Sequence, residues 1–263
     1  MKIRKDDEMD SSWIAFQKEN NKAKYDILLF PHSGAGASVF ASWGKVFQKN
    51  HFNFYPIQYP MREGRKNEEM PSSLTEIARE IAESLMEVFK KNRYILYGRC
   101  TGSLVAYEVA RYVYKKLGIH PKLFVAASAL SPNDCKLEPM DDKASSKEWA
   151  KKFIDLHFLD PNVVQDEMFL EFYMPVLKAD YKMQVDYQCI PDYQLECHIY
   201  TLYGKEDKVI DGEKLEHWQA FTKNQVHQVG FTGEHFFENR ENLGEICNLI
   251  QSAFVHNEER SSV

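Results

Sequence analysis

Short apolar runs alternate with amphipathic stretches along most of the chain. Six apolar runs predict buried strands, at residues 25–30, 52–59, 93–97, 122–127, 197–203 and 225–229. Three stretches with apolar side chains every three or four positions predict helices, at residues 74–89, 101–117 and 240–254. This alternation predicts an α/β fold, with a mostly parallel central sheet and helices on both faces. We expect residues 1–263 to form a single domain.

Residues 132–190 interrupt the alternation, because they contain no convincing strand and have the pattern of two or three helices rich in bulky apolar side chains. An insertion after a central strand would lie over the carboxyl ends of the strands, where open α/β sheets bind ligands. We interpret the segment as a helical lid, in which Phe172 and Met174 line an acyl pocket. The alternative is that these helices simply extend the core.

The segment Gly98-Arg99-Cys100-Thr101-Gly102 follows an apolar strand and precedes a helix. This is the pattern of a nucleophile elbow, with cysteine in the place of serine. The helix N-terminus behind Cys100 favours a thiolate, and Arg99 either adds to this effect or points into solvent. A buried, inert cysteine is the alternative for this pentapeptide taken alone. The pattern predicts acyl transfer through a thioester on Cys100.

A cysteine nucleophile requires a base and a group that orients the base. In α/β-hydrolases these follow the nucleophile in the order acid, then histidine. Asp207 and His235 each come just after an apolar run, in turn-like sequence, and in the required order. We therefore predict a Cys100–Asp207–His235 triad. Glu206 is the competing acid, and a turn cap is the alternative role for Asp207.

An oxyanion needs two N–H donors. We assign one to Thr101, directly after the nucleophile. The second falls to Ser33 in the loop Pro31-His32-Ser33-Gly34-Ala35-Gly36, whose small residues let backbone approach substrate. A phosphate-binding loop is disfavoured because no Lys-Ser or Lys-Thr follows.

Composition narrows the classes of function. Hydrophobic residues make up 44% and charged residues 27% of the chain, and no apolar run is long enough to span a bilayer. The net charge of −6 disfavours nucleic acid as the main partner. Five cysteines without C-x-x-C spacing disfavour disulfides and zinc. The charged N-terminus does not have the pattern of a signal peptide, so we expect a cytoplasmic protein. We also expect no metal and no cofactor of its own.

The chain resembles the type II thioesterases of nonribosomal peptide and polyketide assembly lines. Five segments carry the resemblance, in order: Phe30-Pro31-His32-Ser33-Gly34; Tyr59-Pro60-Met61-Arg62-Glu63; Gly98-Arg99-Cys100-Thr101-Gly102; Pro175-Val176-Leu177-Lys178-Ala179-Asp180-Tyr181; and Gly204 to Asp207 with Gly233-Glu234-His235-Phe236-Phe237. The chain departs from the family at positions 99, 100 and 101, where the family has His, Ser and Met.

The resemblance implies that the substrate is an acyl or aminoacyl thioester on the phosphopantetheine arm of an acyl or peptidyl carrier protein. Arg62, Arg65 and Lys66 would face this acidic partner, or would form an ordinary solvated turn. The family implies thioester hydrolysis. Sulfur at position 100 suits the alternative, transfer of the acyl group to another thiol or to an amine. A non-catalytic binding module is the third hypothesis. We expect a monomer.

Overall fold

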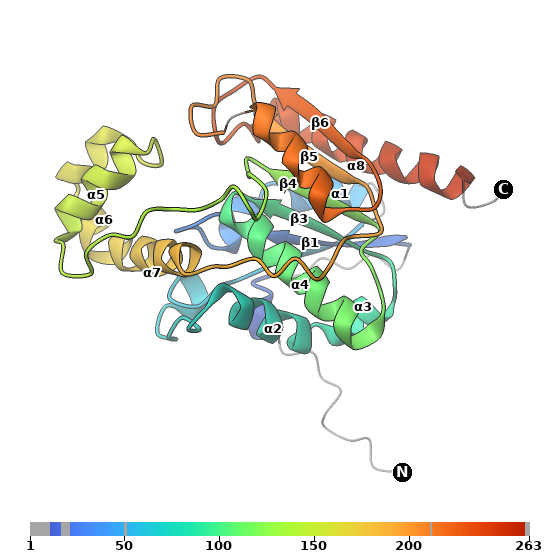
Figure 1. Ribbon diagram of the computed structural model, residues 1–263, viewed down its shortest axis with the longest axis horizontal. Coiled ribbons are helices and arrows are strands. Elements are labelled where there is room, and N and C mark those ends of the chain that lie inside the picture. The colour runs from blue at the N-terminus through green and yellow to red at the C-terminus, as the bar shows by residue number, and fades with distance from the viewer. Residues whose placement is uncertain (1–10, 17–21, 50–51, 211, 261–263) are drawn as a thin grey trace, which may run out of the picture.

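The computed structural model describes residues 11–16, 22–49, 52–210 and 212–260. The strands are β1 (Tyr25–Phe30), β2 (Phe52–Pro56), β3 (Tyr94–Arg99), β4 (Leu123–Ala127), β5 (Ile199–Gly204) and β6 (Val226–Phe231). They form one sheet in the order β2-β1-β3-β4-β5-β6, and each neighbouring pair is parallel (Figure 1). The predicted α/β fold is confirmed.

The helices outside the insertion are α1 (Gly44–Lys49), α2 (Leu74–Ser84), α3 (Met86–Lys90), α4 (Thr101–Leu117) and α8 (Arg240–Arg260). Short 3-10 helices are η2 (Ser11–Trp13), η3 (Ala37–Phe40), η4 (Glu63–Arg65) and η6 (Gly212–Phe221). Helices α2, α3 and α4 pack on one face of the sheet, and α1 and α8 pack on the other. Burial of apolar side chains on both faces supplies the main driving force for the fold.

The insertion between β4 and β5 contains α5 (Ser146–Asp155), η5 (Pro161–Gln165), α6 (Glu167–Phe172) and α7 (Met174–Val185). Helix α5 begins at a reciprocal capping box between Ser145 and Glu148. These helices share a small apolar core of their own, separate from the two cores of the sheet. They lie beyond one end of the sheet, at the left of Figure 1.

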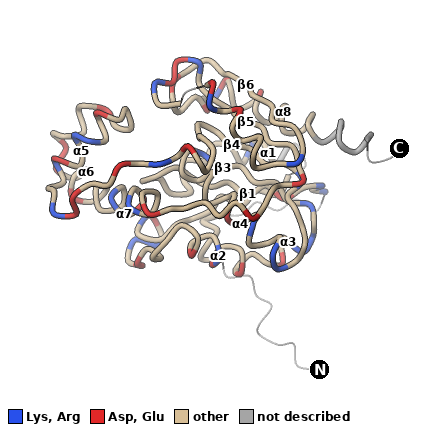
Figure 2. Tube along the Cα trace, in the orientation of Figure 1, with Lys and Arg blue, Asp and Glu red and all other residues tan. Residues whose placement is uncertain are grey.

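Charged residues lie mainly along the helices and loops that surround the sheet (Figure 2). Within the described part of the chain, no helix has the length and apolar character needed to cross a membrane.

Candidate active site

A sharp turn joins β3 to α4, and Cys100 lies at its tip. The backbone of Cys100 has φ 51° and ψ −123°, a conformation that residues with a side chain rarely adopt. Two glycines permit the close approach of backbone here. A Cβ on Gly98 would lie 2.3 Å from the Cα of Ser103, and a Cβ on Gly102 would lie 2.3 Å from the carbonyl oxygen of Phe30. The turn therefore holds the thiol at the N-terminus of α4.

Asp207 follows β5 and His235 follows β6, and the two side chains meet. Nδ1 of His235 lies 2.8 Å from Oδ2 of Asp207, and both side chains are almost fully buried. The other oxygen, Oδ1, accepts the backbone N–H groups of the second and third residues after Asp207, at 2.7 and 3.2 Å. Asp207 is therefore a turn cap and the partner of the histidine at once. Glu206 instead accepts a hydrogen bond from the backbone N–H of Gly233.

The thiol and the imidazole shift each other's pKa. Burial raises the pKa of Cys100, but the hydrogen bond and charge of His235, together with Thr101, bring it below its ordinary value. Burial lowers the pKa of His235, but Asp207 and Cys100 raise it well above its ordinary value. Nε2 of His235 is buried and makes no other hydrogen bond among the described residues, so the thiol is the group that acts on this nitrogen. The arrangement favours a thiolate–imidazolium pair.

Ser33 and Thr101, the two residues predicted to supply the oxyanion donors, lie side by side. Their hydroxyl oxygens are 2.8 Å apart, and Oγ1 of Thr101 is 3.9 Å from the sulfur of Cys100. Thr101 is the first residue of α4, so its N–H belongs to the helix end that has no intrahelical acceptor. The structure thus gathers both residues beside the thiol. Their role as oxyanion donors stays a prediction.

A cavity of about 1120 Å³ lies between the strand ends and the insertion. Cys100 and His235 line it from the sheet side, and Phe158, Phe172 and Leu177 line it from the insertion. Apolar residues of the insertion therefore line the same cavity as the thiol. Residues 132–190 are called the lid below.

The prediction that Met174 lines the acyl pocket is wrong. Its side chain is fully buried in the lid's own core, with Trp149, Phe153 and Tyr181, and it does not line the cavity. Helix α6 ends at Phe172 and α7 begins at Met174, so the two side chains do not share one helix face. Phe172 does line the cavity and is 61% exposed.

This difference predicts opposite effects for two substitutions. Phe172→Ala should change the ratio of kcat/KM between long and short acyl thioesters several-fold, with little change in the denaturation midpoint. Met174→Ala should lower the free energy of unfolding by about 2–5 kcal/mol, because it leaves a hole in the lid's core. Steady-state kinetics and denaturant titration measure the two effects. Altered chain preference in Met174→Ala without a loss of stability would contradict this assignment.

A family model, the thioesterase domain, matches residues 26–254, which include nearly the whole sheet, the lid, and Cys100, Asp207 and His235. This chain belongs to the thioesterase family. In this thioesterase a cysteine stands at the elbow tip, and the histidine and aspartate of the predicted triad lie at hydrogen-bonding distance from each other.

Relatives of this thioesterase occur in natural-product pathways. The gramicidin S biosynthesis protein GrsT of Aneurinibacillus migulanus is 27% identical over 228 residues, which cover 86% of this chain and 88% of GrsT. Phenyloxazoline synthase MbtB of Mycobacterium tuberculosis is 27% identical over 227 residues, but the chain covers only 16% of MbtB. The structure of RedJ, a thioesterase from the prodiginine pathway of Streptomyces coelicolor, shares the fold, with a TM-score of 0.77, 23% identity, and coverage of 88% of this chain and 91% of RedJ.

Arg99 neither points into solvent nor serves the thiol directly. Its Nε donates to Oε1 of Glu238 at 2.7 Å, and both side chains are buried. The hydroxyl of Tyr97 donates to the same oxygen at 3.0 Å. The guanidinium also lies over the ring of Phe40, 5.1 Å from its centre. In this thioesterase the pair therefore ties the elbow to the loop that carries His235.

His32 is a site residue that the sequence analysis did not single out. It lines the cavity, and its ring lies 4.4 Å from that of Phe236. Burial, with the nearby charges of Arg99, His235 and Arg62, lowers its pKa to about 3. A neutral imidazole therefore lies close to the charged pair. The only sequence signal for His32 is its place in the segment Phe30 to Gly34, which resembles the thioesterase family.

Of the three cations predicted to face a carrier, only Lys66 is exposed at the cavity. Arg65 lies over the ring of Trp13 at 4.1 Å and pairs with Glu68 at 2.6 Å. Arg62 is buried and pairs with a lid residue. The prediction that Arg62 is a surface residue is wrong, because its partner lies far along the chain, at position 180.

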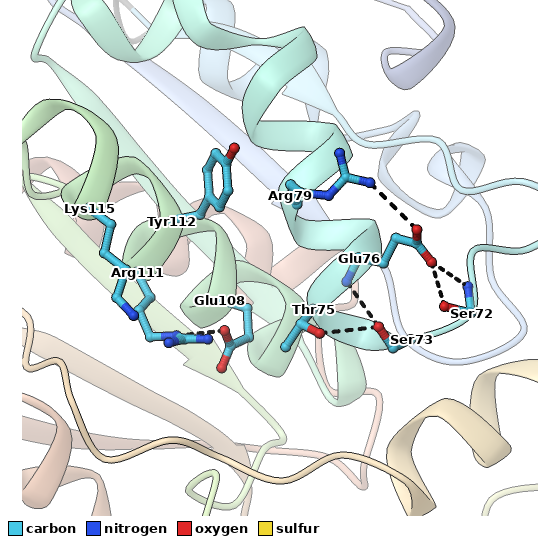
Figure 3. A pocket seen from close by; sticks show the side chains of 9 residues that line it. All are labelled: Ser72, Ser73, Thr75, Glu76, Arg79, Glu108, Arg111, Tyr112 and Lys115. Carbon is cyan, nitrogen blue, oxygen red and sulfur yellow. Dashed lines mark hydrogen bonds and ion pairs between the residues drawn. The ribbon is translucent and has the colours of Figure 1, made fainter.

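A second pocket, of about 470 Å³, lies between α2 and α4 (Figure 3). The cations that line it have acidic partners: Arg79 pairs with Glu83 and Arg111 with Glu108, and Lys115 pairs with Asp192. The first two ion pairs lie within α2 and within α4, and the third joins α4 to the segment after the lid. The balance of charge gives the pocket no preference for an anionic ligand.

Proposed function

We propose that this protein is a thioesterase of nonribosomal peptide or polyketide biosynthesis. Its substrate is an acyl or aminoacyl thioester on the phosphopantetheine arm of an acyl or peptidyl carrier protein, and Cys100, His235 and Asp207 carry out the reaction. The observation that carries the proposal is the thiol at the elbow tip, paired with a histidine that is held by Asp207, at the base of a lidded cavity.

The reaction has two steps, formation of an acyl-enzyme and its hydrolysis. The thiolate of Cys100 attacks the carbonyl carbon, and the oxyanion that forms accepts the N–H groups of Thr101 and Ser33. Its collapse breaks the carbon–sulfur bond to pantetheine, and His235 gives its proton to the leaving thiolate. Water, deprotonated by His235, then attacks the acyl-Cys100 thioester. The products are a free acid and the restored thiol of Cys100.

The family and the relatives support this class of substrate, because GrsT and RedJ belong by name to biosynthetic pathways. The cavity of about 1120 Å³ exceeds the usual size of small-molecule pockets, which suits an acyl chain together with part of a pantetheine arm. The proposal needs no resident cofactor, since the carrier brings the phosphopantetheine. It places a monomeric enzyme in the reducing cytoplasm, where a catalytic thiol persists.

Acyl transfer is the second candidate, and the cysteine itself favours it. Exchange of one thioester for another is close to neutral in free energy, whereas a serine enzyme would pass through a more stable oxygen ester. The lid supports transfer further, because a transferase must keep water from the acyl-enzyme. The acceptor would be a second carrier thiol or an amine.

Mass spectrometry of the enzyme mixed with loaded carrier tests both candidates. We expect a brief acid quench followed by peptide mapping to place the acyl group on Cys100. Cys135 also lines the cavity, so it is the internal control. An adduct on Cys135 with Cys100 unmodified would overturn the proposal. Release of free acid without an acceptor supports hydrolysis, whereas acylation of a second carrier or an amine without free acid supports transfer.

A further inference from the structure

One face of the lid helix α7 touches the parts of the predicted oxyanion hole. Leu177, Asp180 and Gln184 are spaced three and four residues apart, so they share this face. Leu177 packs so closely on the loop after β1 that a Cβ on Gly34 would lie 2.5 Å from its Cδ2. Gln184 accepts a hydrogen bond of 2.7 Å from the hydroxyl of Thr101. The lid is therefore in direct contact with the catalytic loops.

The loop after β1 forms a turn in which the N–H of Ala35 donates to the carbonyl of His32 at 3.1 Å. Gly34, with φ +79°, occupies the third position, which in a type II turn requires positive φ. The carbonyl of His32 and the N–H of Ser33 belong to one peptide plane and point in opposite directions. The turn therefore directs the N–H of Ser33 outward.

Asp180 determines which N–H of the turn stays available. Its Oδ2 accepts the N–H of Gly34 at 2.7 Å, so that donor is occupied. The N–H of the neighbouring Ser33 takes part in no hydrogen bond between described residues. The lid carboxylate thus fixes the turn from one side, and the N–H assigned to the oxyanion remains unused.

Arg62 holds the carboxylate in place. Its guanidinium donates to both oxygens of Asp180, at 2.7 and 2.8 Å, and the two side chains are only 5% and 6% exposed. Arg62 also donates to the carbonyl of Pro60 at 2.9 Å and to that of Ala35 at 3.2 Å. A buried charge without its partner is strongly destabilising, so the pair favours one seated position of α7.

We infer that Asp180 is a positioning residue that couples closure of the lid to assembly of the oxyanion hole. With α7 seated, Asp180 and Leu177 hold the turn so that the N–H of Ser33 and that of Thr101 converge on the substrate carbonyl oxygen. With α7 displaced, the turn loses both contacts and the hole loosens. Attack of Cys100 on the substrate thioester is thereby confined to the closed state of the lid. The inference rests on the proposed function, since the hole matters only if Cys100 attacks a carbonyl.

The test compares two reactions of Cys100. Acylation by a thioester needs the oxyanion hole, whereas alkylation by iodoacetamide forms no oxyanion. Asp180→Ala should lower the acylation rate by about 10²–10³-fold, as the loss of an oxyanion donor does, and leave the alkylation rate within about threefold. Asp180→Ala combined with Arg62→Gln leaves no unpaired buried charge and should show the same split. Asp142→Ala, which removes the exposed partner of Lys182 on α7, should leave both rates unchanged.

The outcomes separate the two proposals. No acylation of the wild-type enzyme overturns the proposed function itself. Acylation restored in the double variant, or both rates lowered together, overturns the coupling alone, because Asp180 would then only neutralise Arg62 or support the fold. If neither variant folds, hydrogen exchange of the wild type decides. The N–H of Gly34 donates to Asp180, so it should exchange at the same rate as the backbone N–H groups of α7 that are exposed when the helix opens. Protection of the Gly34 N–H that outlasts the opening of α7 would overturn the inference.

Discussion

Replacing His235 with alanine is expected to lower thioester turnover by about a hundredfold or more. The imidazole accepts the thiol proton, stabilises the thiolate as its partner cation, and returns a proton to the leaving group. Alanine can do none of these, while Asp207 keeps its two backbone hydrogen bonds within its own turn. The loss should therefore appear in kcat/KM of the folded enzyme, beside the smaller loss of stability that follows when the buried Asp207 carboxylate loses its charged partner.

His235→Ala should also change the pH dependence of the rate at which Cys100 is alkylated. In the wild type, the pKa of Cys100 lies below and that of His235 above its ordinary value, so the ion pair exists across the interval between them. Alkylation should fall only when the pH drops through the lowered thiol pKa. Without His235, burial raises the pKa of the thiol, and alkylation at neutral pH should slow markedly. Rates of alkylation by iodoacetamide between pH 5 and 10 measure this shift.

His217 supplies a matched control. It also hydrogen-bonds to a carboxylate, that of Asp134, at 3.0 Å, but it is half exposed and does not line the cavity. His217→Ala should leave both turnover and the alkylation profile unchanged. An alkylation profile of His235→Ala that matches the wild type would mean that His235 does not act on the thiol.

The strands, and the positions of Cys100, Asp207 and His235 in the loops that follow them, could be predicted because each depends on local pattern. Apolar runs that are buried on both sides identify the strands, and the residues that follow them identify the loops at the carboxyl edge. The predicted ends of strands and helices agree less well with the structure. The run 52–59 stays buried to its end, yet β2 stops at Pro56 and Ile57 forms an isolated bridge with Ile14 instead. The expected helix 74–89 divides at Leu85 into α2 and α3.

The partners of the site residues could not be predicted, because they lie far apart in sequence. Arg62 pairs with a residue 118 positions later, and Arg99 with one 139 positions later. A charged residue in a turn is usually solvated, so local pattern favoured exposure for Arg62 and left it open for Arg99. The prediction that Met174 lines the acyl pocket was wrong for a related reason. Apolar residues in a lid face either the cavity or the lid's own core, and composition does not distinguish the two.

Asp207→Asn should lower turnover by roughly 10²–10⁴-fold while leaving the fold intact. The amide oxygen of asparagine can still accept the two backbone N–H groups of the turn that bond to Oδ1 in the wild type. Its NH₂ group would then face Nδ1 of His235, which must become the acceptor. The ring proton would move to Nε2, the nitrogen that faces the thiol. An imidazole in that tautomer cannot take the thiol proton.

Glu206→Gln is the matched control, because it changes the neighbouring carboxylate, which accepts a hydrogen bond from Gly233 rather than from His235. We expect its kcat/KM with a thioester substrate to stay near that of the wild type. The two variants should also differ in the alkylation of Cys100 at neutral pH, which should slow only in Asp207→Asn, because a neutral imidazole with the wrong tautomer no longer stabilises the thiolate. A larger loss of kcat/KM in Glu206→Gln than in Asp207→Asn would show that Glu206, not Asp207, orients His235.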